Sequence, residues 1–423
     1  MRFNLIIILF LLAQLSFSQS RKTYLLENRI DLRNQNSKFI SETDFKIIGF
    51  GAYHGSAKTY EAELILLNSL IKSRLLDYYI IEGNLSQSYF FQRYLDTGDE
   101  SLLKELVHAY KSIVTQEGTI ETYNFWKELR KQTLKHPEKP LNIIGCDIIW
   151  EYKFPIKHIL DLTKDETSWG EREALKELLS NDTLDFSVWS NQTSKVSNTL
   201  KRFVNNFILN SNMYEKYVKD KETFNFLIAG LSHNFQEAFE NDQNRIDREK
   251  IIYDNFLVLH QKLSLDSKKL FAKYGIFHIQ KDREDDYPSF FTRLIENNIY
   301  ERDEVITVNA YLTNSKSLGR TIYDENGNFK SFTTYSGVDL DDHWKSYFKG
   351  IRHLKSAKFS DLTLFKLNQA NSPYSKKAHL IEIKIPFKDY NSSDLKSKNT
   401  LLFIDYALLI DNSKEQIPIE EMK

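Results

Sequence analysis

One stretch near the start of the chain, between Lys46 and Gly83, constrains the fold most strongly. The run Ile47–Tyr53 is apolar with glycines toward its end, which is the pattern of a strand buried on both faces of a parallel sheet. Apolar residues recur at helical spacing through Thr59–Arg74, and Tyr78–Ile81 is a second short apolar run. A strand, a helix and a strand in this order predict a βαβ unit, and therefore a parallel sheet covered by helices.

Later runs of the same kind predict the rest of the sheet. They have short apolar centres bounded by polar or turn-forming residues, and we expect strands at Leu141–Ile148, Lys269–Ile279, Glu304–Tyr311, Leu362–Leu367, His379–Ile385 and Leu401–Ile410. Asp324–Asn328 contains Asn-Gly and predicts a hairpin turn inside Arg320–Tyr335. The intervening helices are expected over Tyr89–Leu95, Leu102–Tyr110, Ile120–Leu134 and Arg245–Leu263.

The expected fold class is therefore α/β, with a mostly parallel central sheet flanked by helices. A polar, glycine-poor segment from about 154 to 244 predicts a large helical insertion, of the sort that covers a site. The part from about 300 to 412 is rich in predicted strands. Because no linker rich in glycine, proline or serine interrupts the chain, residues 19–423 are expected to form a single α/β domain.

The first residues, Met1–Ser18, have the features of a secretory signal peptide. Arg2 supplies the positive start, Leu5–Leu12 the apolar centre, and Ser16-Phe17-Ser18 a cleavage site of small residues. The apolar centre is too short to span a bilayer. We therefore expect a protein exported to the periplasm or the medium, with no stable membrane insertion after cleavage. An uncleaved anchor is the alternative.

The amino-acid composition limits the classes of partner and cofactor that this chain is expected to bind. The formal net charge is −1, so no general affinity for nucleic acid or for an anionic membrane is implied. The single cysteine, Cys146, excludes an internal disulfide and is expected to be an inert core thiol. No phosphate-binding loop, dinucleotide fingerprint or zinc-protease motif is present. A small-molecule substrate and no cofactor are expected, and the oligomeric state stays open.

Titratable side chains follow several of the predicted strands. His54, Glu82 and Asp147 come directly after the strands beginning at Ile47, Tyr78 and Leu141, and His278 lies at the end of Lys269–Ile279. Open α/β sheets bind ligands beyond the carboxyl ends of their strands. Histidines and carboxylates at one edge of a sheet favour proton-transfer chemistry.

Each candidate has a functional and a structural interpretation. His54 is expected to act as general base, since histidine titrates near neutral pH, or simply to form hydrogen bonds at a strand end. Glu82 would orient the imidazole or activate water, or would cap a helix or bind an arginine. Asp147 would join this site or cap the next helix. Arg248, beside the buried stripe of its helix, would stabilise an oxyanion or form a salt bridge to Glu82 or Asp147. His278 would be a second acid–base group, or a histidine of the core or of the rim.

Other residues are assigned less active roles. Ser56 lacks the Gly-x-Ser-x-Gly surroundings of a serine nucleophile and is expected to cap the following helix. His233 and Asn234 lie in a polar stretch and are expected at the surface.

Together these motifs resemble the erythromycin esterase family. The resemblance rests on His54-Gly55 after a buried strand, Glu82 at an interval of 28 residues, Gly145-Cys146-Asp147, Arg248-Glu249 with Asn255, and the strand carrying His278. It covers roughly Ile47 to Gln280, about half of the chain. It implies an α/β fold with a helical insertion beside a deep cleft, and metal-independent hydrolysis of an ester or lactone with His54 as general base.

The chain departs from that family at two positions. The family, like the related Tiki and ChaN-like proteins, normally has Gly-Glu before the first histidine, whereas this chain has Gly51-Ala52-Tyr53-His54. Lys58 stands where an acid is common in macrolide-hydrolysing members. Two alternatives therefore stay open. One is a metal- or haem-related protein of the Tiki/ChaN type with His54, Glu82, Asp147 and His278 as ligands. The other is a binding protein whose catalysis has lapsed.

Overall fold

The structure is a computed structural model that describes residues 21–34, 39, 45–111, 114–165, 168–181, 184–188, 195–236, 247–284, 286–336, 341–385, 395 and 397–422. The predicted signal peptide, Met1–Ser18, lies outside the described residues, and so does part of the predicted insertion. In the described part of the chain, no helix combines the length and the apolar character that a membrane crossing requires.

The fold class predicted from the sequence is confirmed. In the part of the chain that the structure describes, eight strands form a mainly parallel sheet in the order β1-β11-β13-β6-β2-β5-β3-β4. Their bounds are β1 (Arg29–Asp31), β2 (Ile47–Gly51), β3 (Tyr78–Ile81), β4 (Asn142–Gly145), β5 (Leu270–Tyr274), β6 (Val305–Thr313), β11 (Leu362–Lys366) and β13 (Tyr406–Asp411). The chain also divides into two compact units, Met1–Leu75 with Lys273–Gln416, and Leu76–Ala272 with Ile417–Lys423. Each unit is described by itself below.

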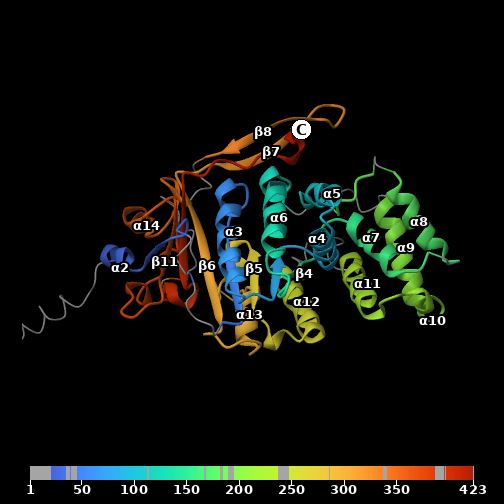
Figure 1. Ribbon diagram of the computed structural model, residues 1–423, viewed down its shortest axis with the longest axis horizontal. Coiled ribbons are helices and arrows are strands. Elements are labelled where there is room, and N and C mark those ends of the chain that lie inside the picture. The colour runs from blue at the N-terminus through green and yellow to red at the C-terminus, as the bar shows by residue number, and fades with distance from the viewer. Residues whose placement is uncertain are drawn as a thin grey trace, which may run out of the picture. The chain divides into compact units, whose positions relative to one another are not determined.

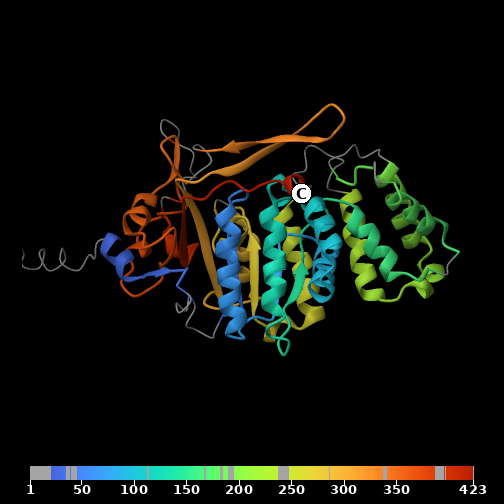
Figure 2. The ribbon, with the colours of Figure 1, turned by 45° about the horizontal axis from the view of Figure 1, so that its top comes forward.

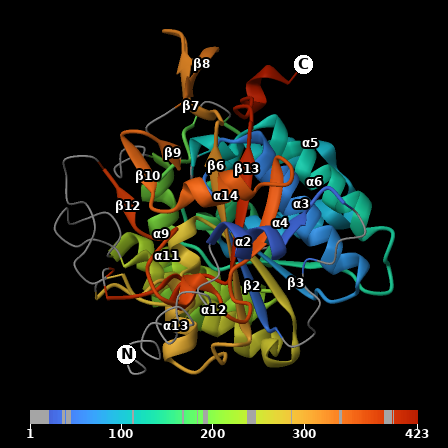
Figure 3. The same ribbon diagram turned by 90° about the vertical axis from the view of Figure 1, so that its left-hand side faces the viewer.

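The first unit contains a parallel core of three strands with two antiparallel strands at its edge. β2 and β13 both pair in parallel with β6, while β11 pairs antiparallel with β13 and with β1. All five residues of β2 are buried, as its unbroken apolar sequence predicts. The α-helices of this unit among the described residues are α2 (Arg21–Glu27), α3 (Ala57–Lys72), α13 (Phe290–Glu296) and α14 (Ile351–Ala357). α2 and α14 lie side by side (Figure 3).

A long hairpin lies between β6 and α14 in the chain order of this unit. β7 (Ser317–Tyr323) and β8 (Phe329–Tyr335) pair with each other in a separate two-stranded sheet (Figure 2). The predicted turn is confirmed, because the Asp324 carboxylate accepts hydrogen bonds from the backbone N–H groups of Asn326 and Asn328. Gly327 adopts φ 81°, a conformation that glycine takes at no steric cost.

Two predicted strands in this unit are partly wrong. In His379–Ile385 only Ile383–Lys384 is a strand, β12, which pairs with β10 (Ser346–Phe348) and through it with β9 (Asp342–His343). Leu380 adopts φ 69°, which an extended strand does not permit. Leu401–Ile410 likewise begins with the 3-10 turn Thr400–Leu402, and only its second half is β13. Compact buried turns are apolar too, so composition alone did not separate them from strands.

The second unit contains the strands that precede Glu82 and Asp147. β3 pairs in parallel with β4, with Ile81 opposite Gly145, and with the first residues of β5. Its helices are α4 (Leu85–Thr97), α5 (Glu100–Tyr110), α6 (Ile120–Thr133), α7 (Lys153–Leu162), α8 (Gly170–Leu179), α9 (Lys195–Leu209), α10 (Ser211–Tyr214), α11 (Lys221–Gln236) and α12 (Arg248–Leu263). Figure 1 shows α7 to α11 gathered in one bundle, which is the helical segment that the sequence predicted.

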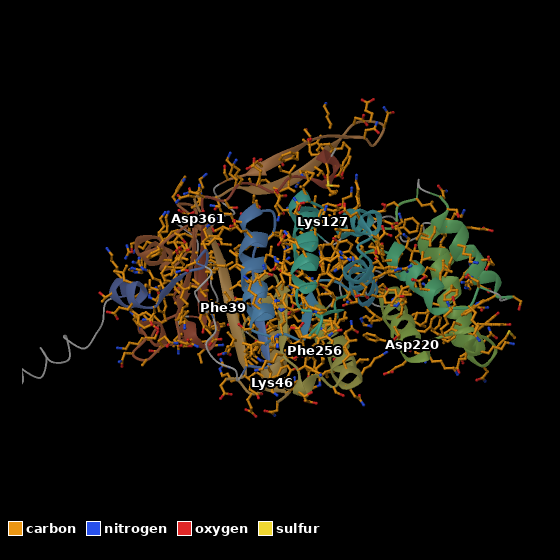
Figure 4. All side chains as sticks on the ribbon, in the orientation of Figure 1. Phe39, Lys46, Lys127, Asp220, Phe256 and Asp361 are labelled. Atoms are coloured by element: carbon orange, nitrogen blue, oxygen red, sulfur yellow. The ribbon has the colours of Figure 1, made fainter. Side chains whose placement is uncertain are left out.

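The bundle has its own apolar core around the fully buried Trp169. The indole stacks on Phe203 at 4.6 Å and on Tyr214 at 4.3 Å between ring centroids. α12 instead presents Ile252, Phe256 and Leu259 inward, the stripe expected from its sequence, and Phe256 is labelled in Figure 4. Burial of such faces supplies most of the helical stability, since short helices are marginal alone.

Candidate functional site

Glu82 and Asp147 lie close together because their strands are parallel neighbours. Glu82 directly follows β3 and Asp147 follows β4 by two residues, so both stand at the carboxyl ends of the two strands. The loops after the two strands touch, with the Asp147 N–H donating to the Gly83 carbonyl oxygen at 3.0 Å. A Cβ atom at Gly145 would overlap the carbonyl oxygens of Gly83 and Asn84. A glycine is therefore required where the loops approach most closely.

Arg248 joins the two carboxylates. It is the first residue of α12, and its Nε donates to Asp147 Oδ1 at 2.9 Å. Its Nη2 donates to Asp147 Oδ2 and, at 3.0 Å, to Glu82 Oε1. We call Glu82, Asp147 and Arg248 the ion cluster. The salt bridge that the sequence left as an alternative for Arg248 is thus present with both partners.

The ion cluster is buried and firmly held. Glu82 is 4% exposed and Asp147 is 2% exposed. Burial alone would lower the pKa of Arg248, but the charges and hydrogen bonds of Asp147 and Glu82 outweigh it and raise that pKa well above its ordinary value. The guanidinium also lies 5.6 Å from the centre of the Trp150 ring. The arginine is therefore fixed in its charged form.

Surrounding side chains hold the loops that carry the cluster. The Asn255 amide nitrogen donates to the Cys146 carbonyl oxygen at 3.0 Å, and the Tyr110 hydroxyl donates to the Glu82 carbonyl oxygen at 2.8 Å. Cys146 is buried, as predicted. Asn234 is buried too, and its amide nitrogen donates to the Ile149 carbonyl oxygen at 2.7 Å. The prediction of a surface position was wrong for Asn234, because a single sequence does not show a partner 85 residues away.

His54 belongs to the other unit, where its backbone is fixed from two directions. Ser317 Oγ donates to the His54 carbonyl oxygen at 2.9 Å, and the N–H groups of Leu318 and Gln416 donate to the Gly55 carbonyl oxygen. Gly55 adopts φ 89°, and a Cβ atom there would overlap Ser317 Oγ. The His54 side chain is half-buried. A histidine on a fixed backbone is suited to a positioned role.

Tyr53 precedes His54 and is hydrogen-bonded to an acid, Asp341, that no sequence pattern marks. Its phenol forms a hydrogen bond with Asp341, whose carboxylate also accepts from the Leu312 N–H at 2.6 Å. Burial raises the pKa of Asp341 well above its ordinary value, and burial also raises the pKa of Tyr53. Ala52, which directly precedes Tyr53, is 1% exposed. Asp341 follows no apolar strand pattern, so no sequence signal marked it.

His278 does not lie at the end of a strand, which corrects the prediction. β5 ends at Tyr274, and Ile276–Ile279 form a 3-10 turn in which the His278 N–H donates to the Gly275 carbonyl oxygen at 3.1 Å. The apolar residues after Gly275 belong to this turn, although their composition suits a strand. The His278 ring is half-buried and lies 5.5 Å from the ring centre of Tyr274.

Two further residues can now be placed. Ser56 is the N-cap residue of α3, as predicted, although its hydroxyl makes no capping hydrogen bond. Lys58 is paired with Asp361 at 2.6 Å and donates to the Asp411 carbonyl oxygen. Among the residues that the structure describes, no group of three or more histidine, cysteine, aspartate or glutamate side chains is arranged to hold a metal ion.

The sequence matches no protein-family model and no curated protein. Solved structures do match. A succinoglycan biosynthesis protein is 14% identical with a TM-score of 0.62, over 95% of this chain and 99% of its own. A Bacillus cereus protein is 13% identical with a TM-score of 0.60, over 94% and 98%. A mutant of the erythromycin esterase EreC, in its open conformation, is 11% identical with a TM-score of 0.55, over 89% and 93%. At these identities the likeness shows a distantly related fold.

Proposed function

We propose that this chain is an exported hydrolase that cleaves an ester or lactone with a water molecule activated by His54. The fold likeness to an erythromycin esterase and the ordered motifs of the sequence support ester chemistry. The observation that carries the proposal is the ion cluster. Three residues chosen from the sequence, up to 166 positions apart, are in direct contact, buried and hydrogen-bonded. Perturbed, buried charges gather at functional sites more often than elsewhere.

The proposed reaction needs only water and the substrate. The His54 imidazole takes a proton from water while the water oxygen forms a bond to the acyl carbon. The tetrahedral intermediate then breaks its bond to the alkoxide oxygen, which takes the proton back from the imidazolium. The products are a carboxylic acid and an alcohol, or a hydroxy acid from a lactone.

The ion cluster is proposed to position groups and to set the local charge. Two carboxylates face one guanidinium, so the charge of Arg248 is already balanced and the cluster carries one net negative charge. This balance favours a role in holding the Glu82 carboxylate and the loops after β3 and β4 in place. It disfavours the alternative in which Arg248 mainly stabilises an oxyanion, because an oxyanion would add negative charge to a negative cluster.

Hydrolysis assays with the mature protein test the proposal. An aryl acetate, a small lactone and a macrolide would be offered to metal-stripped protein, to metal-loaded protein and to His54→Ala. We expect turnover of at least one substrate without metal, and a loss of 10²-fold or more in His54→Ala, the range that a general base contributes. Turnover only with metal, or equal turnover in His54→Ala, would reject the mechanism.

A second candidate follows from Ala52. Because the carboxylate that the family places there is absent, a binding protein without turnover is the competing proposal. It predicts that a ligand of the wild-type protein is bound with unchanged affinity by His54→Ala and is never hydrolysed.

A further inference from the structure

The end of the helical bundle where α9 meets α10 exposes large apolar side chains. Leu209, the last residue of α9, is 81% exposed, and Ile208 and Met213 are 50% and 57% exposed. We call these three residues the apolar corner. α10 lies at one end of the bundle (Figure 1). Exposed apolar residues are usually scattered singly, and a group of them with a polar rim marks a surface that binds a partner.

The apolar corner is carried on a firmly packed support. The opposite side of α9 presents Phe203 and Phe207 to the core of the bundle, and both are buried. Within α10, Tyr214 stacks on the buried Trp169 at 4.3 Å between ring centroids. These contacts fix the inward side of both helices, so the side chains of the apolar corner stay directed to solvent.

Basic side chains border the apolar corner. Arg202 precedes Leu209 by seven residues, which is about two helical turns, so both lie on the exposed side of α9. Lys216 lies in the 3-10 turn that directly follows α10, and Lys219 comes three residues later. All three basic side chains are exposed. We call Arg202, Lys216 and Lys219 the basic rim.

The contacts of the basic rim leave its positive charge in place, because each is made with a neutral group. These groups are the Thr199 hydroxyl at 3.5 Å from Arg202 Nη2, the Tyr217 ring centre at 4.9 Å from Lys216 Nζ, and the Asp161 carbonyl oxygen at 2.9 Å from Lys219 Nζ. A contact with a neutral group does not cancel a charge. The basic rim therefore presents three positive charges to solvent.

Acidic side chains close to the apolar corner are already paired. The sequence from Lys195 to Tyr214 contains no aspartate or glutamate. Glu215, the next acid along the chain, forms an ion pair with Lys221 at 2.9 Å. The start of α8 reaches the same end of the bundle through Trp169, and its Glu173 forms ion pairs with Arg172 and Lys176. The local charge is thus positive, although the formal net charge of the chain is −1.

The size and composition of this surface favour a lipid over a protein partner. A stable protein–protein interface takes about 20–30 residues on each side and is depleted of lysine. A few aliphatic side chains bordered by long basic ones suit the boundary between lipid headgroups and acyl chains instead. There the apolar groups leave water while the basic groups stay at the level of the phosphates.

We propose that the apolar corner and the basic rim dock this protein on an anionic lipid surface. Ile208, Leu209 and Met213 enter the headgroup boundary, and the basic rim contacts lipid phosphates. This docking is peripheral and reversible, which agrees with the expectation of no stable membrane insertion. The inference does not depend on the proposed function, because neither His54 nor the ion cluster takes part in it.

Sedimentation with lipid vesicles tests the inference. The protein would lack Met1–Ser18, so that the apolar leader contributes nothing to binding. We expect binding to phosphatidylglycerol vesicles, and about 100-fold weaker binding to phosphatidylcholine vesicles, since each of the three basic residues contributes roughly fivefold near an anionic surface. Raising the salt concentration from about 0.05 M to about 0.5 M should weaken the binding to phosphatidylglycerol.

Two sets of variants separate the apolar from the charged contribution. Leu209→Ser combined with Met213→Ser should weaken binding to phosphatidylglycerol vesicles about tenfold or more, because two exposed apolar side chains are lost. Val258→Ser is the matched control, since Val258 is 44% exposed on α12 and should leave binding unchanged. Circular dichroism checks that each variant keeps its helices.

Replacing the whole basic rim by glutamine should abolish the preference for phosphatidylglycerol. Lys127→Gln is the control for this set, because Lys127 is already paired with Glu100 at 2.7 Å. No binding to phosphatidylglycerol vesicles, equal binding to both lipids, or equal binding by the Leu209→Ser, Met213→Ser variant would overturn the inference. Analytical ultracentrifugation supplies a further test. A wild-type dimer that this double variant loses would assign the apolar corner to a second copy of the chain and overturn the inference as well.

Discussion

Removing the guanidinium of Arg248 should destabilise the second unit strongly. In Arg248→Met the buried carboxylates of Glu82 and Asp147 lose the donors at 2.9 Å and 3.0 Å that now hold them, together with the second bond to Asp147. Methionine keeps much of the apolar stem, so the change isolates the charge. Breaking a buried ion pair by removing one partner costs about 3–5 kcal/mol. A loss of about 4 kcal/mol lowers the folding equilibrium constant roughly a thousandfold.

Denaturant unfolding followed by far-ultraviolet circular dichroism measures this loss. Arg93→Met is the matched control, since Arg93 forms an ion pair with Asp161 at 2.9 Å in the same unit but is 51% exposed at its side chain. An exposed pair contributes about 0–1 kcal/mol. The Arg248→Met cost should also shrink when Glu82→Gln and Asp147→Asn are already present, because no buried charge is then left unpaired. Equal losses for Arg248→Met and Arg93→Met would refute the reasoning.

Three further predictions concern stability. Burial raises the pKa of Glu151 from 4.5 to about 8, so the folded protein keeps a proton that the unfolded chain releases between these values. The free energy of unfolding should therefore fall as pH rises from 5 to 9, by roughly 5 kcal/mol at most, and fall less in Glu151→Gln. Gly55→Ala should cost more than Gly327→Ala in thermal unfolding: both glycines have positive φ, but only at Gly55 would a Cβ atom meet Ser317 Oγ. Asp99→Ala should lower the free energy of urea unfolding by about 1 kcal/mol, because Asp99 caps α5.

Local patterns predicted the elements best. The residues Tyr78–Ile81 were predicted as a strand and are β3, because an apolar run of four between Asp77 and Glu82 leaves little freedom in its bounds. The helix expected over Tyr89–Leu95 forms the body of α4. The strand predicted over Lys269–Ile279 is too long, and the physical reason is the same one that made the other strand predictions succeed. Apolar composition reports burial, and the buried turn after Gly275 is as apolar as the strand before it.

The site was only partly predictable. The positions of Glu82 and Asp147 follow from the rule that parallel strands end at one edge, and Arg248 was marked by its place beside a buried stripe. Asp341 and Asn234 were not marked. Their roles depend on partners in segments distant in sequence, Tyr53 for Asp341 and the Ile149 carbonyl oxygen for Asn234. Periodicity carries no information about such contacts.

The central claim is that His54 activates water for ester hydrolysis, and the most direct test compares kcat/KM for benzyl acetate among three metal-stripped proteins. These are the wild type, His54→Ala, and His343→Ala as a histidine control outside the proposed site. The account predicts turnover by the wild type and by His343→Ala, and a fall of 10²-fold or more in His54→Ala. Wild-type turnover that His54→Ala retains in full, or no turnover by any of the three, would contradict it.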